Sequence, residues 1–295
     1  MENTLRYARA ISTAGVAMRR SIRWLCQSLL VCSLGCRGYV QELPDAATLS
    51  DAGQTADAGE SPDGGGPDGG AADSGDTYLP WEGGAAYYAK WTRGPPSDPS
   101  YFPIAVWLQS EGNATKYAAI GVNLFIGLWQ GPTDDQLNVL ADAGMPAVAD
   151  QSGVWASHLN DATIPAWRIP DDEPDNAQPD GSGGYGPCIS PSTIVSDYQA
   201  IVAADATRPV YLNLGQGVAY DAYVGRGSAC SGRLDMYAEY EKGADIVSFD
   251  IYPVNNTDGT THGNLWYVAQ GVDRLRQWSE YKKPVWNWIE VTGID

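Results

Sequence analysis

The chain has 295 residues, 43% of them apolar, which is enough to build a substantial hydrophobic core. Its net charge is −18 and unevenly spread: residues 1–40 hold six basic residues against one acidic, and the remainder holds 12 against 35, a balance of −23. Such an acidic body argues against binding nucleic acid, whose phosphates require the opposite charge, and is compatible with a solvated extracellular protein.

The N-terminal residues are arranged like an export signal. Three arginines within 19–23 precede an apolar stretch at 24–34, which is too short to cross a bilayer as a permanent helix, and Cys36 follows. We therefore predict a signal peptide over residues 1–36. The pattern resembles a bacterial lipoprotein signal, which implies that Cys36 is lipidated and attaches the protein to the membrane; ordinary cleavage and free release is the alternative. Both predict a protein secreted or lipid-anchored at the bacterial cell envelope.

Residues 37–77 are predicted to be a disordered linker. From residue 41 to 76 the chain is rich in Asp, Ala, Gly, Ser and Pro and has no aromatic residue, so it cannot bury enough apolar surface to offset its conformational entropy. Aromatic residues return at Tyr78, and we predict one folded domain over residues 78–295.

Seven short apolar runs with strand composition alternate with amphipathic helical segments in this domain. The runs lie at residues 102–109, 122–129, 145–150, 165–173, 209–215, 245–253 and 284–291. One intervening helix is marked by a cap at Thr133, with Gln136 three residues later, and by Gly144 at its end. Repeated βα units of this kind predict an α/β fold with a parallel sheet.

Most of the predicted strands end in polar residues, which favours a barrel over a doubly wound sheet. All strand C-termini of a barrel converge on one mouth, so these residues would share one site. We therefore predict a (β/α)8 TIM barrel, with the doubly wound sheet as the alternative. The sequence ends at Asp295, soon after the seventh run, so we expect seven βα strands with the eighth missing from a C-terminally incomplete barrel.

Two glutamates stand at the ends of the fourth and seventh runs. Glu173 lies in the sequence DDEPDN, where Pro174 ends the strand, and Glu290 ends the aromatic run VWNWIE. An acid at the end of an apolar run is either functional or costly, because burying an unpaired charge is unfavourable. Retaining glycoside hydrolysis needs one acid to protonate the leaving oxygen and a second carboxylate to attack. We predict Glu173 as the acid/base and Glu290 as the nucleophile; an idle solvated acid is the alternative for each.

The DEP triplet at 172–174, together with a glutamate ending the seventh strand, resembles the catalytic positions of the clan A glycoside hydrolases. This superfamily includes cellulases, mannanases and β-galactosidases, and the resemblance covers about residues 100–292. It implies that Asp172 stands where the clan usually has an asparagine that binds the sugar 2-hydroxyl, which keeps the acceptor and loses the amide donor. It also implies that Tyr252 lies near a clan tyrosine that hydrogen-bonds the nucleophile.

Other strand-end residues are predicted to contact a sugar. Tryptophan rings suit the C–H faces of sugars, although packing in the core is an equal alternative, and polar groups at strand ends suit the hydroxyls. The predicted substrate-binding set is Asp172, Tyr252, Trp107, Gln109, Trp129, Asp150, Asn213 and Trp288.

Two further predictions concern cysteines and cofactors. Cys188 and Cys230 lie in Gly/Ser-rich loops of an exported domain, which makes them candidates for one disulfide. We expect no metal, because His158 and His262 lack metal-ligand spacing. We expect no cofactor, because the glycines of GSGGYG at 181–186 follow no strand and open no clear helix, which argues against a phosphate-binding loop. The absence of a G-x-S-x-G elbow argues against a Ser-His-Asp site.

The sequence thus predicts a retaining glycoside hydrolase that cleaves O-glycosidic bonds of an extracellular polysaccharide or oligosaccharide by double displacement. A non-catalytic surface barrel that binds carbohydrate is the alternative. The predicted partner is a carbohydrate in both cases, with no nucleic acid.

Overall fold

The computed structural model describes residues 81–226, 230, 232–256 and 260–291. They belong to the second of the two compact units of the chain, Asp76–Asp295. The predicted signal peptide, its Cys36 and the predicted linker lie outside the described residues, so they stay predictions.

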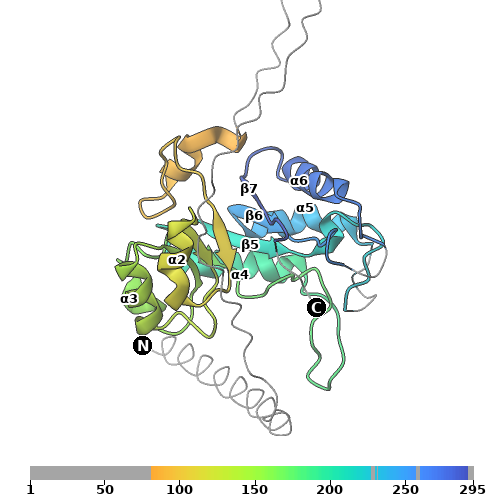
Figure 1. Ribbon diagram of the computed structural model, residues 1–295. Helices are drawn as coiled ribbons and strands as arrows, with labels where there is room; N and C mark the ends of the chain where they lie inside the picture. Colours follow the sequence, from red (N-terminus) through yellow and green to blue (C-terminus); the bar gives the residue numbers. More distant parts are fainter. Residues whose placement is uncertain (1–80, 227–229, 231, 257–259, 292–295) are drawn as a thin grey trace, which may run out of the picture. The chain divides into compact units, whose positions relative to one another are not determined.

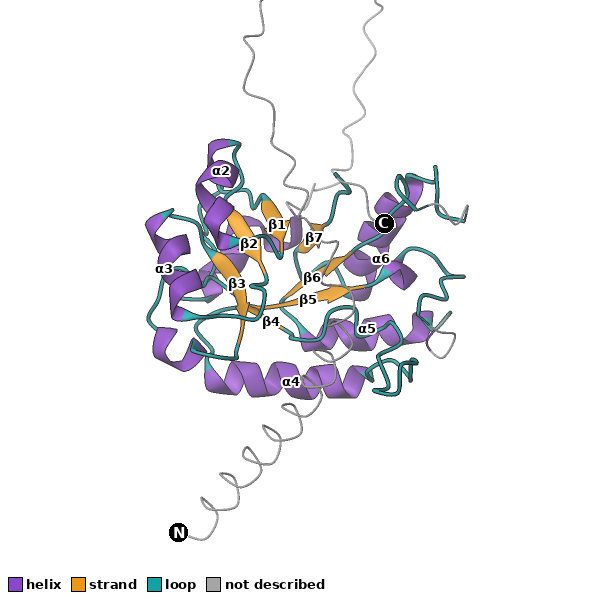
Figure 2. Cartoon of the chain, turned by 60° about the horizontal axis from the view of Figure 1, so that its bottom comes forward, coloured by secondary structure: helices purple, strands orange, loops and turns teal. Residues whose placement is uncertain are grey.

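Seven parallel strands form one sheet in the order of the sequence. They are β1 (Ala105–Trp107), β2 (Leu124–Ile126), β3 (Ala147–Asp150), β4 (Trp167–Arg168), β5 (Val210–Leu214), β6 (Ile246–Phe249) and β7 (Val285–Asn287). Each strand lies inside one of the seven predicted runs. The strands from β2 to β6 are buried almost throughout, and a strand buried on both faces of a parallel sheet reads as a short apolar stretch. Figure 2 shows the strands as an arc with helices on its outer side.

The predicted TIM barrel is wrong, because the sheet is an open half-barrel. β1 pairs with β2 and β7 pairs with β6, and neither outer edge has a strand partner within the described part of the chain. The rings of Trp107 and Trp288 instead meet edge to face, with their centroids 5.5 Å apart. Side-chain packing rather than a backbone ladder therefore connects the two ends of the arc.

Large side chains fill the concave face of the sheet. Leu124 and Ile126 of β2 are buried there, and Tyr211 of β5 is buried with them. The residue between the first two, Phe125, belongs to the cluster on the other face, as the alternation of a strand requires. The concave face is therefore packed core over most of its depth.

The helical segment η2 (Trp81–Lys90) covers the amino ends of the strands. The hydroxyl of Tyr87 donates to the backbone oxygen of Asp245, directly before β6, at 2.6 Å. Trp286 Nε1 donates to the hydroxyl of Tyr88 at 2.9 Å. With this end covered, the opposite, carboxyl end is the one where loops can shape a site.

Helices cover the convex face of the sheet (Figure 1). They are α2 (Ala114–Ala119), α3 (Asp134–Asp142), α4 (Pro191–Ala204), α5 (Tyr237–Tyr240) and α6 (Trp266–Trp278), with short 3-10 turns η3 (Glu111–Asn113), η4 (Trp155–His158), η5 (Gln216–Val218), η7 (Leu234–Met236) and η8 (Glu241–Gly243). Gly271 of α6 lies against Phe249 of β6, where a Cβ atom would be 2.2 Å from the ring. None of the helices in the described ranges has both the length and the hydropathy to span a membrane.

The predicted cap of the helix after the second strand is confirmed. Thr133 Oγ1 accepts from the backbone nitrogen of Gln136 at 3.2 Å, and Gln136 Oε1 accepts from the backbone nitrogen of Thr133 at 3.1 Å. Gly144 follows the helix with a φ of +62°, as a glycine at a helix C-terminus does. Local capping signals therefore fixed both ends of α3.

Glu241, a buried acid before β6, is expected to make the free energy of unfolding fall as the pH rises. Glu241 is 2% exposed and neither of its carboxyl oxygens has a hydrogen-bond partner, and burial raises its pKa from 4.5 to about 8. Between these two values the folded protein keeps a proton that the unfolded chain has lost, so stability decreases across this window. Glu241→Gln is expected to raise the unfolding free energy at pH 8 by on the order of 3 kcal/mol.

Urea unfolding of both proteins at pH 4 and pH 8 tests this expectation. The variant and the parent should agree at pH 4, where Glu241 is protonated in the folded state, and separate at pH 8. Parallel pH profiles for the two proteins would contradict the assignment.

Candidate active site

Strained backbone gathers at the carboxyl edge of the sheet. Leu108 after β1, Gln130 after β2 and Glu173 after β4 have φ angles of +45°, +56° and +49°. Side chains with a Cβ pay roughly 1–2 kcal/mol in this region, and such residues persist where surrounding contacts hold them, often at functional sites. The positive φ angles therefore mark this edge, and Glu173 in particular, as a candidate functional site.

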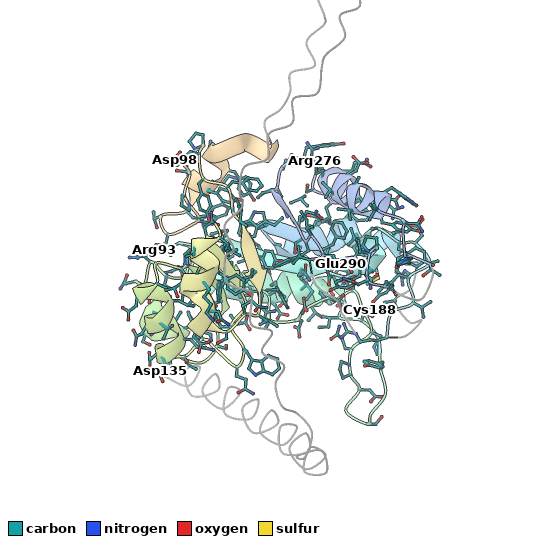
Figure 3. All side chains as sticks on the ribbon, in the orientation of Figure 1. Arg93, Asp98, Asp135, Cys188, Arg276 and Glu290 are labelled. Atoms are coloured by element: carbon teal, nitrogen blue, oxygen red, sulfur yellow. A yellow bond between two sulfur atoms is a disulfide. The ribbon has the colours of Figure 1, made fainter. Side chains whose placement is uncertain are left out.

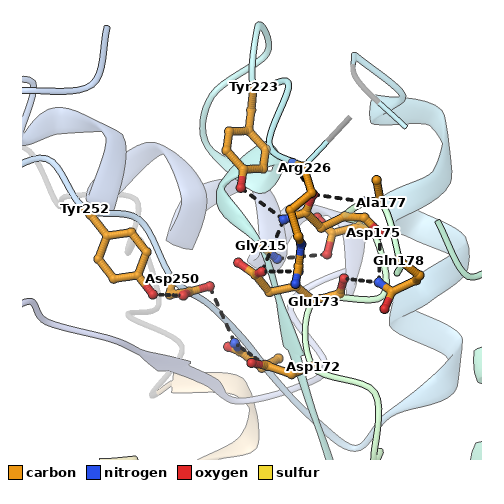
Figure 4. Close-up of polar contacts among 12 residues, drawn as sticks. Asp172, Glu173, Asp175, Ala177, Gln178, Gly215, Tyr223, Arg226, Asp250 and Tyr252 are labelled. Atoms are coloured by element: carbon orange, nitrogen blue, oxygen red, sulfur yellow. Dashed lines mark hydrogen bonds and ion pairs between the residues drawn. The ribbon is translucent and has the colours of Figure 1, made fainter. Parts of the chain in front are cut away.

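The loop after β4 fixes the backbone of Glu173. Its carbonyl oxygen accepts from the backbone nitrogen of Asn176 at 2.9 Å and from Gln178 Nε2 at 3.1 Å. A Cβ atom on Gly215 would lie 3.1 Å from Glu173 Oε1, so the carboxyl group lies against the end of β5. Figure 4 shows Glu173 at the centre of a polar network drawn from several strand ends.

Two donors engage one oxygen of the Glu173 carboxyl group. Oε2 accepts from Arg226 Nη2 at 2.7 Å and from Asn176 Nδ2 at 3.2 Å. The Glu173 side chain is 15% exposed, so its ion pair with Arg226 is partly buried and still accessible to solvent. A substrate group could therefore reach the carboxyl group.

Neighbouring carboxyl groups raise the pKa of Glu173. Burial is the largest cause, and the charges of Asp175 and Asp172 add to it, while Asn176 and Arg226 act in the opposite direction. Asp175 is itself buried, accepting from the backbone nitrogen of Gly215 at 2.8 Å, and burial raises its pKa as well. A carboxyl group with a raised pKa can keep its proton near neutral pH, which a general acid requires.

Asn213 of β5 bridges two further carboxyl groups. Its Nδ2 donates to Asp172 Oδ1 at 3.0 Å and to Asp250 Oδ1 at 3.5 Å. Its Oδ1 accepts from Trp288 Nε1 at 3.1 Å and from Ser248 Oγ at 2.6 Å. Because an indole nitrogen can only donate, the amide orientation of Asn213 is fixed, and its nitrogen must face the carboxyl groups. Asn213, predicted to bind sugar, has its polar atoms engaged within the protein.

Asp250 and Tyr252 form a pair at the end of β6. The Tyr252 hydroxyl donates to Asp250 Oδ2, whereas the resemblance implied a bond from this tyrosine to the nucleophile. Burial raises the pKa of Asp250 well above its usual range, and the charge of Glu173 is the next cause. Asp250 and Glu173 therefore lie close enough for the charge on one to influence the other.

Glu290, labelled in Figure 3, lies three residues beyond the end of β7. Its Oε2 accepts from the backbone nitrogen of Val254 at 2.8 Å, and its Oε1 accepts from that of Asn255 at 2.8 Å. Both oxygens thus hold the loop after β6. The described contacts of Glu290 include no hydrogen bond to Glu173.

Two predicted sugar-stacking residues are packed in the concave core. Trp107 contacts Trp288 edge to face, and the guanidinium of Arg168 lies 5.3 Å from the centre of the Trp107 ring. Trp288 Nε1 also donates to the Tyr211 hydroxyl at 3.0 Å. Both indoles are partly buried and fill the seam.

Two predicted polar contacts are also engaged internally. Gln109 Oε1 accepts from the Tyr117 hydroxyl at 2.8 Å, which turns the side chain toward α2. Asp150 accepts from Arg168 Nε at 2.7 Å and Nη2 at 2.9 Å, a bidentate ion pair. By contrast, Trp129 is 68% exposed on the loop after β2, and Asp172 is also exposed, so these two remain available to a ligand.

A disulfide ties the loop that carries Arg226. Cys188 and Cys230 are bonded, with their Cα atoms 5.8 Å apart, so these two candidates are joined in the structure. Sequence reasoning missed Arg226, Asn176 and the contribution of Asp175 to the environment of Glu173. The adjacent DEPDN sequence was a signal for the last two, whereas Arg226 is 53 residues away from its partner and had none.

Within the described residues, no group of three or more His, Cys, Asp or Glu side chains is arranged to hold a metal ion.

Comparisons with known proteins give distant likenesses. A scan against family models and a search of curated proteins found no match. Among solved structures, the chain is similar to the C-terminal domain of Legionella pneumophila ChiA at 9% identity, with a TM-score of 0.35 over 52% of this chain and 59% of that one. It is also similar to a GH2 β-galacturonidase from Eisenbergiella tayi bound to galacturonate, at 16% identity and a TM-score of 0.34 over 57% and 29%.

A third similar structure is a glycosyl hydrolase family 2 member from Bacteroides cellulosilyticus, at 14% identity and a TM-score of 0.31 over 63% of this chain and 28% of that one. The chain thus spans about three fifths of the first of these proteins and under a third of the other two. TM-scores of this size assign neither a fold nor an activity.

Proposed function

We propose that the protein is a glycoside hydrolase acting on an extracellular polysaccharide or oligosaccharide. The observation that carries the proposal is the placement of Glu173: a partly exposed carboxyl group with a raised pKa and a strained backbone, among further carboxyl groups at the carboxyl edge of the sheet. Hydrolysis of a glycosidic bond needs one protonated and one ionised carboxyl group near the anomeric carbon. An extracellular substrate follows from the predicted export signal.

In the proposed reaction, Glu173 gives its proton to the glycosidic oxygen as the C–O bond breaks and the electron pair stays on that oxygen. An oxygen of Glu290 attacks the anomeric carbon and forms a glycosyl ester. Water then attacks the same carbon and gives its proton to Glu173, and the ester C–O bond breaks with its electron pair returning to Glu290. Asp172 is proposed to accept from a sugar hydroxyl, and Trp129 to stack on a sugar ring.

The pair of backbone donors on Glu290 is compatible with this role. Each carboxyl oxygen has two lone pairs, and the bonds from Val254 and Asn255 use one on each oxygen, which leaves one on each for an incoming group. These bonds also fix the orientation of the carboxyl group, as preorganisation of a nucleophile requires.

Glu290→Gln is expected to lower the rate of sugar release by at least about 10³-fold, because a neutral amide cannot attack the anomeric carbon as a carboxylate does. Glu239→Gln is the matched control: Glu239 is exposed in α5, pairs with Lys242, and should leave the rate unchanged. Release of reducing sugar by the full chain is the measurement, with melting temperatures to verify folding.

Asp250→Asn separates two assignments of the second carboxyl group. If Glu290→Gln turns over at the parent rate while Asp250→Asn does not, the nucleophile assignment to Glu290 is wrong and Asp250 takes its place. If the parent binds polysaccharide without releasing sugar, the protein is the non-catalytic carbohydrate-binding alternative.

A further inference from the structure

The loop after β5 reaches across to Glu173 and is fastened at several points. The Tyr223 hydroxyl accepts from Asn176 Nδ2 at 3.1 Å, and the backbone nitrogen of Arg226 donates to Asn176 Oδ1 at 3.2 Å. The Arg226 side chain then donates to Glu173 Oε2 at 2.7 Å. Asn176 therefore contacts both the loop and the acid, so the position of one affects the other.

The close approach of this loop depends on Gly225. Its φ is +55°, and a Cβ atom there would lie 2.4 Å from Asn176 Oδ1 and 2.8 Å from the Tyr223 ring. A larger residue would have to push the loop away from Asn176. The sequence thus permits Arg226 to lie directly over the acid.

The disulfide fastens the same loop to the segment that carries Glu173. Cys230 lies four residues after Arg226, and Cys188 is adjacent to Ile189, whose backbone nitrogen donates to the carbonyl of Pro174 at 2.9 Å. Pro174 directly follows Glu173 in the sequence. One covalent bond therefore holds together the two segments that supply the two halves of the ion pair.

We propose that Arg226 is a positioning residue that holds the Glu173 carboxyl group in its resting place, and that the Cys188–Cys230 disulfide keeps Arg226 within reach. The effect of Arg226 on catalysis by Glu173 rests on the proposed function. The Arg226–Glu173 ion pair and its dependence on the disulfide do not. Under oxidising conditions the pair is held. An external dithiol that gives two electrons and two protons, and is itself oxidised to a disulfide, converts Cys188 and Cys230 to two thiols and frees the loop to withdraw its guanidinium.

The charged and titratable groups that face Glu173 come from three segments. Asp172 and Asp175 lie on its own loop, and Asp250 and Tyr252 follow β6. Arg226 comes from the loop after β5, as does Tyr223, whose pKa burial raises to about 12. Among these six groups Arg226 is the single cation, so its removal leaves the negative charges unopposed and raises the pKa of Glu173.

The first test is the titration of Glu173 in the full chain, followed by carbon-13 NMR of labelled glutamate carboxyl groups, with the signal assigned by its loss in Glu173→Gln. Arg226→Gln should raise the titration midpoint by about one pKa unit or more, since a neighbouring opposite charge is worth about 1–3. Arg226→Lys, which keeps the charge, should stay near the parent. Arg93→Gln, which removes an arginine bonded to Asn160, is the matched control and should leave the midpoint unchanged.

The second test concerns the disulfide. Reduction of the protein with dithiothreitol should shift the Glu173 midpoint in the same direction as Arg226→Gln. If the reduced protein loses its fold, the double variant with Cys188→Ser and Cys230→Ser, in which the bond never forms, supplies the same loss of the tether. An unchanged midpoint in Arg226→Gln overturns the role of Arg226; a shift there, with none on reduction or in the double variant, overturns the role of the tether.

Activity supplies a separate readout. If the protein is a hydrolase, a higher pKa of the acid moves the alkaline limb of kcat/KM to higher pH, because the protonated form persists further. If no glycan is cleaved, the proposed function fails while the NMR titration still decides the role of Arg226.

Discussion

Glu173→Gln is expected to abolish most hydrolysis of a polysaccharide, lowering kcat by about 10²–10⁴-fold, the range that general acid catalysis contributes. Glutamine keeps the size of the side chain and can still accept from Arg226 Nη2, so the network around it should persist. What it lacks is a proton to give to the leaving oxygen. Sugar release by the variant and the parent, compared with the surface control Glu239→Gln, measures the loss.

The identity of the leaving group sharpens this prediction. An aryl glycoside releases a phenolate, which is a stable anion and needs little help from a proton donor. Glu173→Gln should therefore slow the formation of the glycosyl ester far less with an aryl glycoside than with a polysaccharide. Equal losses on both substrates would show that Glu173 supports folding or binding and does not donate the proton.

The largest effect on stability is expected at Arg208, which is fully buried before β5. Its Nε donates to the carbonyl of Ile164 at 2.6 Å, its Nη2 to that of Asp161 at 2.8 Å, and its Nη1 to Asp205 Oδ2 at 2.6 Å. The guanidinium also lies 5.2 Å from the centre of the Trp167 ring. One side chain therefore satisfies acceptors on two segments that flank β4 and β5.

Arg208→Met should destabilise the protein by about 3–5 kcal/mol, because it leaves a buried carboxylate and two carbonyl groups without this partner. Trp167 Nε1 still donates to Asp205 Oδ2 at 2.9 Å, which offsets part of the loss. Urea unfolding measures the change, with Arg233→Met as a control on the surface. A midpoint equal to that of the parent would mean that the buried ion pair contributes nothing to stability.

The positions of the strands could be predicted from sequence because each is a short apolar run, but the closure of the sheet could not. Closure depends on whether the first and last strands share a ladder, and that depends on tilt and register over the whole sheet. The sequence therefore leaves a sugar surface and the core as equal alternatives for Trp107 and Trp288, and the structure packs their rings against each other at the seam. Alternation along a strand tells which face a side chain takes, not whether that face is filled.

In the site, too, some residues could be predicted from the sequence and others could not. Glu173 stands out in the sequence because a proline follows it at the end of an apolar run, and its acidic neighbours are adjacent in the chain. Arg226 on the loop after β5 and Asp250 after β6 reach the same region by contacts that no local pattern records. Asn213, predicted at this edge from its strand-end position, bridges Asp172 and Asp250. For Asp150 and Gln109 the strand-end position suggested a ligand contact, while the structure pairs them with Arg168 and Tyr117.

The most direct test of the account is the release of reducing sugar from a panel of neutral, acidic and amino polysaccharides by the full chain, with Glu173→Gln assayed in parallel. The account predicts turnover of at least one glycan by the parent and its loss in the variant. Binding of a glycan with no release of sugar by the parent, or equal release by both proteins, would contradict it.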